Sequence, residues 1–135
     1  MIITWCSRLG ALLAVVLLAC GDGRPQFRST DLTGADYGKS LALTDHTGKP
    51  RKLADFAGKA AVITFGFTHC PDVCPTILAD LAGAMKSLGP DAERVQVLFI
   101  TVDPERDTRE VLAKYLTVFE PRFLGLSGDA EATAR

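Results

Sequence analysis

Apolar residues along the chain gather in runs whose spacing predicts alternating strands and helices. Two nearly continuous apolar runs, at residues 60–67 and 95–102, are rich in β-branched and aromatic residues and are typical of strands covered on both faces. Between them, apolar positions recur at spacings of three and four, which predicts a helix with one buried stripe. That stripe consists of Ile77, Leu78, Leu81, Ala82, Met85 and Leu88. The order of strand, helix and strand predicts a parallel βαβ unit with a right-handed crossover.

Shorter elements are expected on both sides of this unit. Before it, residues 41–44 and 51–53 are predicted to form a hairpin around a turn in which Gly48 supplies a positive φ. After it, Asp107 and Glu110 are close to a capping box that would begin a second helix, and apolar residues between 111 and 119 would form its buried face. Residues 123–126 suggest one more short strand. The chain is therefore predicted to be an α/β protein.

The apolar run near the N-terminus has a different character. Residues 9–19 follow a single positive charge at Arg8 and are too few to span a bilayer, which needs about 20 apolar residues. This pattern predicts a secretory signal peptide over residues 1–19. The sequence Leu-Leu-Ala-Cys at 17–20 resembles the lipobox of bacterial lipoproteins, which would make Cys20 the lipid-modified N-terminus.

An uncleaved anchor helix over residues 2–20 is the alternative for this segment, although Arg8 counts against a clean span. Both interpretations place the rest of the chain outside the cytoplasm, on the periplasmic side of a bacterial cell envelope and attached to its membrane. Residues 20–38 are polar and lack a sustained apolar period, so they are predicted to be a flexible tether. The folded domain is expected over residues 39–135.

Composition and cysteine usage narrow the function. The 135 residues suffice for one domain, and the 15 Lys and Arg against 16 Asp and Glu contain no basic run, so no nucleic-acid partner is expected. Cys6 lies in the predicted signal and Cys20 at the predicted lipid site. Only Cys70 and Cys74 remain in the domain, which excludes a scaffold held together by several disulfides.

Cys70 and Cys74 occupy the junction between the first predicted strand and the helix, in the sequence Phe-Thr-His-Cys-Pro-Asp-Val-Cys-Pro-Thr at 67–76. Sites of open α/β sheets form at such carboxyl ends of strands. Unpaired N–H groups at a helix start stabilise thiolate over thiol and lower the cysteine pKa. Thiolates attack disulfides and also bind metals. Two soft thiolates favour Cu(I), whereas a structural zinc site needs four ligands.

Neighbouring residues are weaker candidates as ligands. His69 adjoins Cys70, but adjacent residues of an extended segment point to opposite sides, so a local hydrogen bond or packing role is favoured over ligation. His46 is expected to be a turn residue. Residues 103–107, Asp-Pro-Glu-Arg-Asp, end the second strand at the same sheet edge as the cysteines. A turn and helix cap are favoured there, and support of the cysteine site from behind is the alternative.

Residues 65–75, Phe-Gly-Phe-Thr-His-Cys-Pro-Asp-Val-Cys-Pro, resemble the signature of the Sco/SenC copper chaperones, which help to build the copper centre of cytochrome c oxidase. Residues 102–108 resemble the family's second characteristic stretch, and the likeness runs from about residue 41 to the end. The resemblance implies a thioredoxin-like fold in which Cys70 and Cys74 bind copper and can also form a redox disulfide. It implies delivery of copper to, or reduction of cysteines in, the copper-receiving oxidase subunit, and a metallochaperone is favoured over an enzyme.

The sequence departs from the family at its C-terminal end. The family's third copper ligand is a histidine well downstream, and neither His46 nor His69 occupies its place. The resemblance therefore implies a thioredoxin-like fold that is incomplete at the C-terminus, with weakened copper binding. Such a fold is expected to expose apolar sheet and unpaired backbone groups.

Two enzyme functions remain open at this point. A thiol-disulfide oxidoreductase acting on the oxidase subunit or other envelope proteins would use the same two cysteines, although redox enzymes of this fold typically carry C-x-x-C rather than C-x-x-x-C. A thiol peroxidase of the peroxiredoxin type is the weaker alternative. The alternative in which the two cysteines have no chemical function is an inert buried pair or an inert disulfide.

Overall fold

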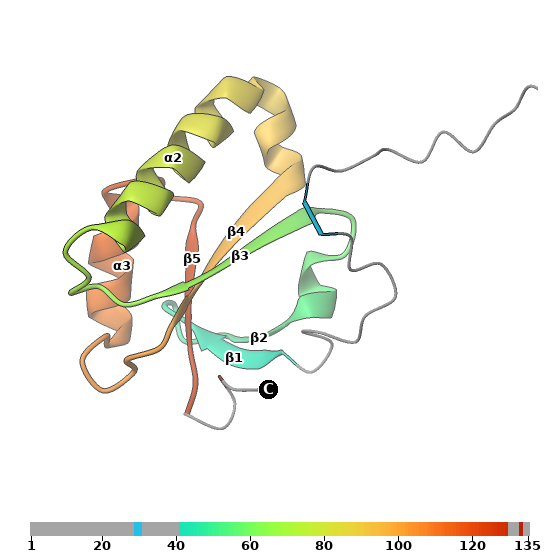
Figure 1. Ribbon diagram of the computed structural model, residues 1–135. Coiled ribbons are helices and arrows are strands. Elements are labelled where there is room, and N and C mark those ends of the chain that lie inside the picture. The colour runs from blue at the N-terminus through green and yellow to red at the C-terminus, as the bar shows by residue number, and fades with distance from the viewer. Residues whose placement is uncertain (1–28, 31–40, 130–132, 134–135) are drawn as a thin grey trace, which may run out of the picture. The chain divides into compact units, whose positions relative to one another are not determined.

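The computed structural model describes residues 29–30, 41–129 and 133. The predicted signal peptide, Cys20 and nearly all of the predicted tether lie outside the described residues. The described part contains a five-stranded sheet with two α-helices (Figure 1). Neither of these helices is long and apolar enough to cross a membrane. The predicted α/β class is confirmed.

The predicted βαβ unit is present, with β3 (Ala60–Gly66) and β4 (Val95–Thr101) paired in parallel along their whole lengths. The helix between them, α2 (Val73–Leu88), carries Pro75 in its first turn, where a missing N–H costs nothing. It ends at Gly89, which adopts a φ of 55°. The chain then continues as a 3-10 helix, η2 (Gly89–Arg94), which the breaker pair Gly89-Pro90 did not indicate.

The burial of α2 is narrower than predicted. Leu78 and Met85 are fully buried, but Ile77 and Leu88 are 38% and 44% exposed. At about 100° per residue, Leu78 and Met85 fall at the centre of the apolar stripe, whereas Ile77 and Leu88 fall at its border. The spacing therefore identified the correct face and overestimated its width.

The remaining strands extend the sheet in the order β2-β1-β5-β4-β3. β5 runs parallel to β4 and antiparallel to β1, and β1 pairs with β2 in the predicted hairpin. Gly48 in its turn has a φ of 88°, as the turn chemistry requires. The bounds of these elements are β1 (Ala42–Asp45), β2 (Pro50–Lys52), the 3-10 helix η1 (Leu53–Phe56), α3 (Arg109–Thr117) and β5 (Leu124–Ser127).

The start of α3 corrects one prediction. Its N-cap is Thr108, whose Oγ1 accepts a hydrogen bond of 3.4 Å from the amide of Val111. Asp107, the expected cap, is instead buried with only 1% of its surface exposed. The favoured interpretation of Asp107 as a capping residue is therefore wrong, because a neighbouring hydroxyl takes that role.

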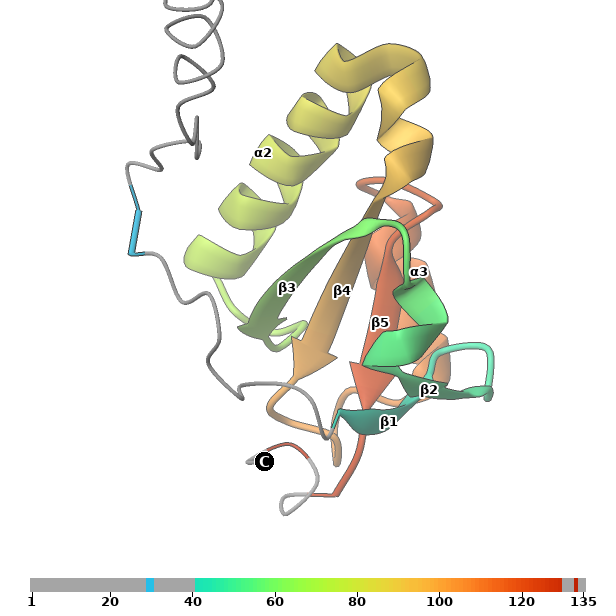
Figure 2. The ribbon, with the colours of Figure 1, turned by 90° about the vertical axis from the view of Figure 1, so that its right-hand side faces the viewer.

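Both α-helices cover the same face of the sheet (Figure 2). Alternation along β4 directs Val97 and Phe99 to this face and Leu98 and Ile100 to the other. The helix-side core consists of Leu78, Met85, Ala92, Val97, Phe99, Leu112, Leu116 and Phe123. The core on the opposite side, beneath η1, is smaller and consists of Leu43, Phe56, Leu98, Ile100 and Leu126.

The far end of the sheet is less well covered. Among the described residues β3 pairs only with β4, so one of its edges carries no partner strand. On the face away from the helices, Ile63, Phe65 and Val102 are 37%, 58% and 55% exposed. The apolar sheet surface that the sequence leads us to expect lies here.

Candidate metal centre

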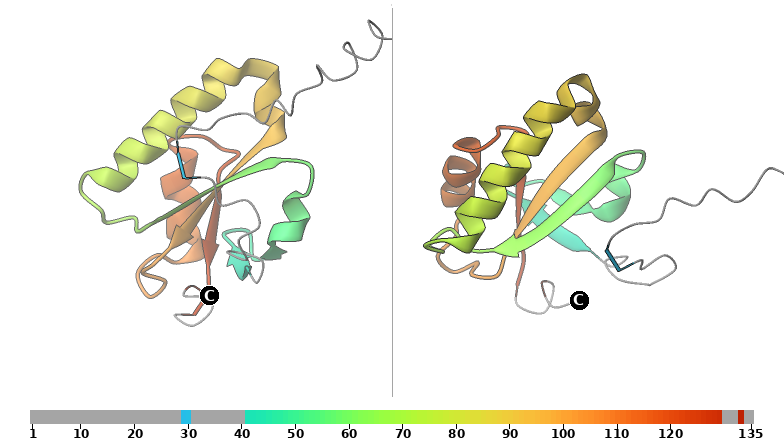
Figure 3. Two further views of the ribbon diagram at one scale, coloured as in Figure 1. Left: turned by 45° about the vertical axis from the view of Figure 1, so that its right-hand side comes forward. Right: turned by 45° about the horizontal axis from the view of Figure 1, so that its top comes forward.

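The two cysteines lie at the junction between β3 and α2. Cys70 belongs to the connecting loop and Cys74 to the first turn of the helix, which begins at Val73. Figure 3 shows this loop turning from the carboxyl end of β3 directly into α2. Both thiols are free, with Cys70 half-buried and Cys74 buried. The structure therefore brings the two predicted residues together at the predicted end of the strand.

Cys70 receives the hydrogen bonds that a thiolate needs. The amide of Cys74 donates to Cys70 Sγ at 3.4 Å, and the Cys70 amide closes a turn by donating to the Phe67 carbonyl at 3.2 Å. A hydrogen bond from the Cys74 side chain, followed by those from the amides of Cys74, Asp72 and Val73, lowers the pKa of Cys70. The direction of the shift agrees with the prediction, although the Cys74 side chain contributes more than the amides of the helix start.

Cys74 has the opposite chemistry. Burial first, and then its contact with the Cys70 side chain, raises the pKa of Cys74. Its sulfur packs against β3 so closely that a Cβ on Gly66 would lie 2.9 Å from Sγ and 2.8 Å from a ring carbon of Phe99. The prediction of a lowered pKa is wrong for Cys74, because sequence spacing does not show which thiol faces the core.

A buried carboxylate lies behind the cysteine loop. Asp107 accepts hydrogen bonds from the amide and hydroxyl of Thr68 at 3.0 and 2.6 Å, and from the hydroxyl of Thr101 at 2.6 Å. Thr68 precedes Cys70 by two residues, whereas Thr101 ends β4. No pattern in the sequence marks either threonine, and only the position of Asp107 beyond the neighbouring strand hints at this contact.

The two described histidines have local roles. His69 has a side chain that is 60% exposed, with Nδ1 lying 3.2 Å from Thr68 Oγ1 and 3.9 Å from Asp107 Oδ1. It sits in a turn rather than in the extended segment that we assumed. His46 bridges the hairpin to β5, because its amide donates to the Gly125 carbonyl at 2.8 Å and its Nδ1 accepts from the Gly125 amide at 3.0 Å.

Tyr115 was expected only as part of the buried face of α3. Its hydroxyl is buried and has no hydrogen-bond partner within the described part of the chain. Burial, and then the proximity of Cys74 and Cys70, raises the pKa of this tyrosine. The phenol therefore stays neutral beside the two sulfurs.

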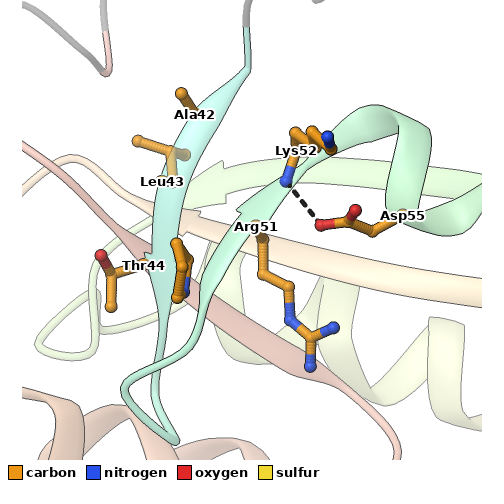
Figure 4. Close-up of a pocket in the computed structure, with 7 residues that line it drawn as sticks. Ala42, Leu43, Thr44, Arg51, Lys52 and Asp55 are labelled. Carbon is orange, nitrogen blue, oxygen red and sulfur yellow. Dashed lines mark hydrogen bonds between the residues drawn. The ribbon is translucent and has the colours of Figure 1, made fainter.

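No group of three or more His, Cys, Asp or Glu side chains within residues 29–30, 41–129 and 133 is arranged to hold a metal ion. Cys70 and Cys74 remain the candidate soft donors within these ranges. A surface hollow of about 440 Å³ lies at the hairpin instead, where Thr44, Arg51 and Asp55 line part of it (Figure 4). Its lining residues contribute no thiol or imidazole.

The model of the SCO1/SenC family matches residues 29–135. The chain belongs to the SCO1/SenC family. The mitochondrial Sco2 homologue of cattle is 47% identical over 116 residues, which cover 84% of this chain and 44% of that protein. The chain thus spans less than half the length of this curated relative.

Solved Sco structures share the fold. ScoI of Bradyrhizobium japonicum with copper bound is 46% identical, with a TM-score of 0.66 over 70% of this chain and 60% of that one. A SCO1/SenC family lipoprotein of Bacillus anthracis is 32% identical, with a TM-score of 0.60 over 67% of this chain and 56% of that one. The thioredoxin-like α/β fold of Sco proteins is confirmed. BsSco, a solved structure 24% identical to this chain, is named as a member of the Sco family of cytochrome c oxidase assembly proteins.

Proposed function

We propose that this protein carries copper as cargo, bound as Cu(I) by the thiolates of Cys70 and Cys74, and supplies it to the copper-receiving subunit of cytochrome c oxidase. The observation that carries the proposal is the free sulfur pair at the start of α2, in a family with copper-bound members. Two thiolates form a soft donor set, which suits Cu(I) better than Zn(II) or the hard cations.

The unequal environments of the two sulfurs suit a carrier. Cys74 is buried against Gly66 and Phe99 and would act as the fixed ligand. Cys70 is half-buried, with its thiolate stabilised by amides of the helix start, and would act as the accessible ligand. Incoming thiolates of the recipient would replace Cys70 first, so that each Cu–S bond that breaks is matched by one that forms.

The N-terminal sequence supports a location at the cell envelope. A signal peptide over residues 1–19 and a lipid on Cys20 would tether the domain to the periplasmic side of a membrane, and a family member from Bacillus anthracis is described as a lipoprotein. Mass spectrometry of the mature protein tests this part. A diacylated N-terminal Cys20 is expected, whereas an intact residue 1 would contradict it.

Reduction of disulfides is a second candidate function, favoured by the lowered pKa of Cys70 beside the raised pKa of Cys74. The Cys70 thiolate would attack a substrate disulfide and form a mixed disulfide. Cys74 would then attack Cys70 Sγ, releasing the substrate dithiol and leaving a Cys70–Cys74 disulfide. An external thiol reductant would supply the two electrons and two protons for the next cycle.

Titration of the reduced full chain with Cu(I), against a competing chromophoric ligand, separates these functions. We expect one bound equivalent that disappears in both Cys70→Ser and Cys74→Ser. Asp80→Ala, at an exposed position of α2, is the control and retains it, and circular dichroism confirms folding. A folded wild type whose copper uptake equals that of Cys70→Ser would contradict the carrier. Steady turnover of a disulfide substrate without tight copper binding would establish the reductase instead.

A further inference from the structure

The carboxyl group of Asp107 is buried behind the cysteine loop. Only 1% of its surface is exposed, and the nearest ionisable nitrogen recorded for it, Nδ1 of His69, lies 3.9 Å away. Burying a carboxylate is costly unless its oxygens are well hydrogen-bonded. Asp107 meets this condition through one amide and two hydroxyl donors, all within 3.0 Å.

These donors come from two segments that are distant from each other in sequence. Thr68 lies 39 residues before Asp107 and belongs to the segment that joins β3 to Cys70. Thr101 lies at the end of β4, and its hydroxyl also accepts from the amide of Asp103 at 3.0 Å. The carboxylate therefore ties the cysteine loop to the loop after the neighbouring strand.

Helix capping does not account for this arrangement, because Thr108 caps α3. The contact to Thr68, by contrast, acts directly on the site. Thr68 lies inside the turn in which the Cys70 amide donates to the Phe67 carbonyl, and this turn places Cys70 Sγ 3.4 Å from the Cys74 amide. Fixing Thr68 at two atoms restricts the backbone that carries the accessible sulfur.

We infer that Asp107 is a positioning residue for the Cys70 thiolate, which it places by hydrogen bonds through Thr68 without touching the metal. This inference rests on the proposed function of the cysteine pair. The hydrogen bonds of Asp107 depend on the shape of its side chain, and a neutral side chain of the same shape can keep them. An asparagine can still accept from the Thr68 amide and the Thr101 hydroxyl through its one oxygen, and it can donate from its amide nitrogen to Thr68 Oγ1.

The experiment compares Asp107→Ala and Asp107→Asn with Asp80→Ala, an exposed aspartate of α2 that serves as the matched control. Two readouts are used on each full chain, the Cu(I) affinity and the rate at which iodoacetamide alkylates Cys70. Loss of a residue that orients a metal ligand typically lowers metal affinity by about 10- to 100-fold. We expect such a loss in Asp107→Ala, with a changed Cys70 alkylation rate, and near-complete rescue in Asp107→Asn.

The outcomes separate this inference from the proposed function. A folded Asp107→Ala protein that matches Asp80→Ala in both readouts overturns the positioning role, and so does an Asp107→Asn protein as impaired as Asp107→Ala. If the wild type binds no copper, the carrier function fails, but the alkylation rates still test the positioning of Cys70. If Asp107→Ala does not fold, Thr68→Val replaces it, and an unchanged affinity and alkylation rate in that variant also overturn the inference.

Discussion

β3 and β4 are adjacent parallel strands with similar apolar sequences, yet their environments differ. Every residue of β4 from Val97 to Thr101 is at most 2% exposed. On β3, Ile63 and Phe65 are 37% and 58% exposed, although Phe65 lies directly beside the buried Ile100 in the register. An apolar run in the sequence therefore predicts a strand, whereas the position of that strand in the sheet determines how much of its surface is buried.

The cause lies in the neighbours of each strand. β4 is flanked by β5 and β3, with the α-helices over one face and η1 near the other. β3 has a single partner strand within the described residues, and only its helix-facing side chains are covered. The well-buried end of β3 is Gly66, next to Cys74. The strand thus combines a buried end at the site with an exposed surface behind it.

The largest predicted difference between the strands concerns two phenylalanines. Phe99→Ala removes a fully buried ring that lies tilted against Tyr115, with the ring centroids 6.0 Å apart, and should lower the free energy of unfolding by about 3–5 kcal/mol. Phe65→Ala removes a ring that is 58% exposed and should cost less than about 1.5 kcal/mol. Urea denaturation of both variants measures the difference. Equal losses would show that the outer face of β3 is covered in solution.

The second prediction tests the opposite edge of the sheet, which the hairpin closes. The carboxylate of Asp45 is fully buried and accepts from the Thr47 amide at 2.8 Å, the Lys49 amide at 3.0 Å and Arg51 Nε at 2.8 Å. Asp45→Asn should lower the free energy of unfolding at neutral pH by about 1.5–3 kcal/mol, since it removes charge-assisted hydrogen bonds.

The pH dependence of this effect follows from the pKa of Asp45. Burial alone would raise that pKa, but the hydrogen bonds from Thr47, Arg51 and Lys49 together hold it well below its usual range. The contribution to stability is therefore complete above the unfolded pKa, about 3.9, and is lost as the pH falls towards the folded pKa. The stability advantage of the wild type over Asp45→Asn should therefore shrink as the pH falls below about 4. A constant advantage would contradict the role of the charge.

The third prediction concerns the buried end of β3. Gly66→Ala places a Cβ 2.9 Å from Cys74 Sγ and 2.8 Å from the Phe99 ring, so the sulfur or the ring must move. We expect a loss of about 1–3 kcal/mol in stability from overpacking, together with weaker Cu(I) binding. Gly83→Ala is the matched control, because its Cβ meets nothing within 4 Å in α2. That variant should gain about 0.5–1 kcal/mol from helix propensity.

The sequence predicted the local elements well because each has a local cause. The apolar runs located β3 and β4, Gly89 ended α2, and the strand-to-helix junction located the cysteine pair. Contacts between loops have no such signal. The bond from Thr68 to Asp107 joins residues 39 positions apart, and the capping role passed to Thr108 for a reason visible only in three dimensions. The opposite pKa shifts of Cys70 and Cys74 likewise depend on which sulfur faces Phe99.

The last prediction concerns self-association through the outer face of β3, and it has the smallest expected effect on stability. An unpaired strand edge with apolar side chains favours association with other strands, and a lysine on such a strand opposes it. Phe65→Lys should change the free energy of unfolding by no more than about 0.5 kcal/mol, because the ring is mostly exposed.

The same substitution should reduce self-association, measured by sedimentation velocity over a range of protein concentrations. Lys59→Glu, an exposed position just before β3, is the control for a change of charge without loss of the apolar ring. A wild type that stays monomeric at every concentration would show that exposed Phe65 does not drive association. Self-association that persists in Phe65→Lys would assign it to another surface. Reduced association with unchanged stability would separate the two roles of β3, because its outer face would then govern assembly while its buried end holds the cysteine site.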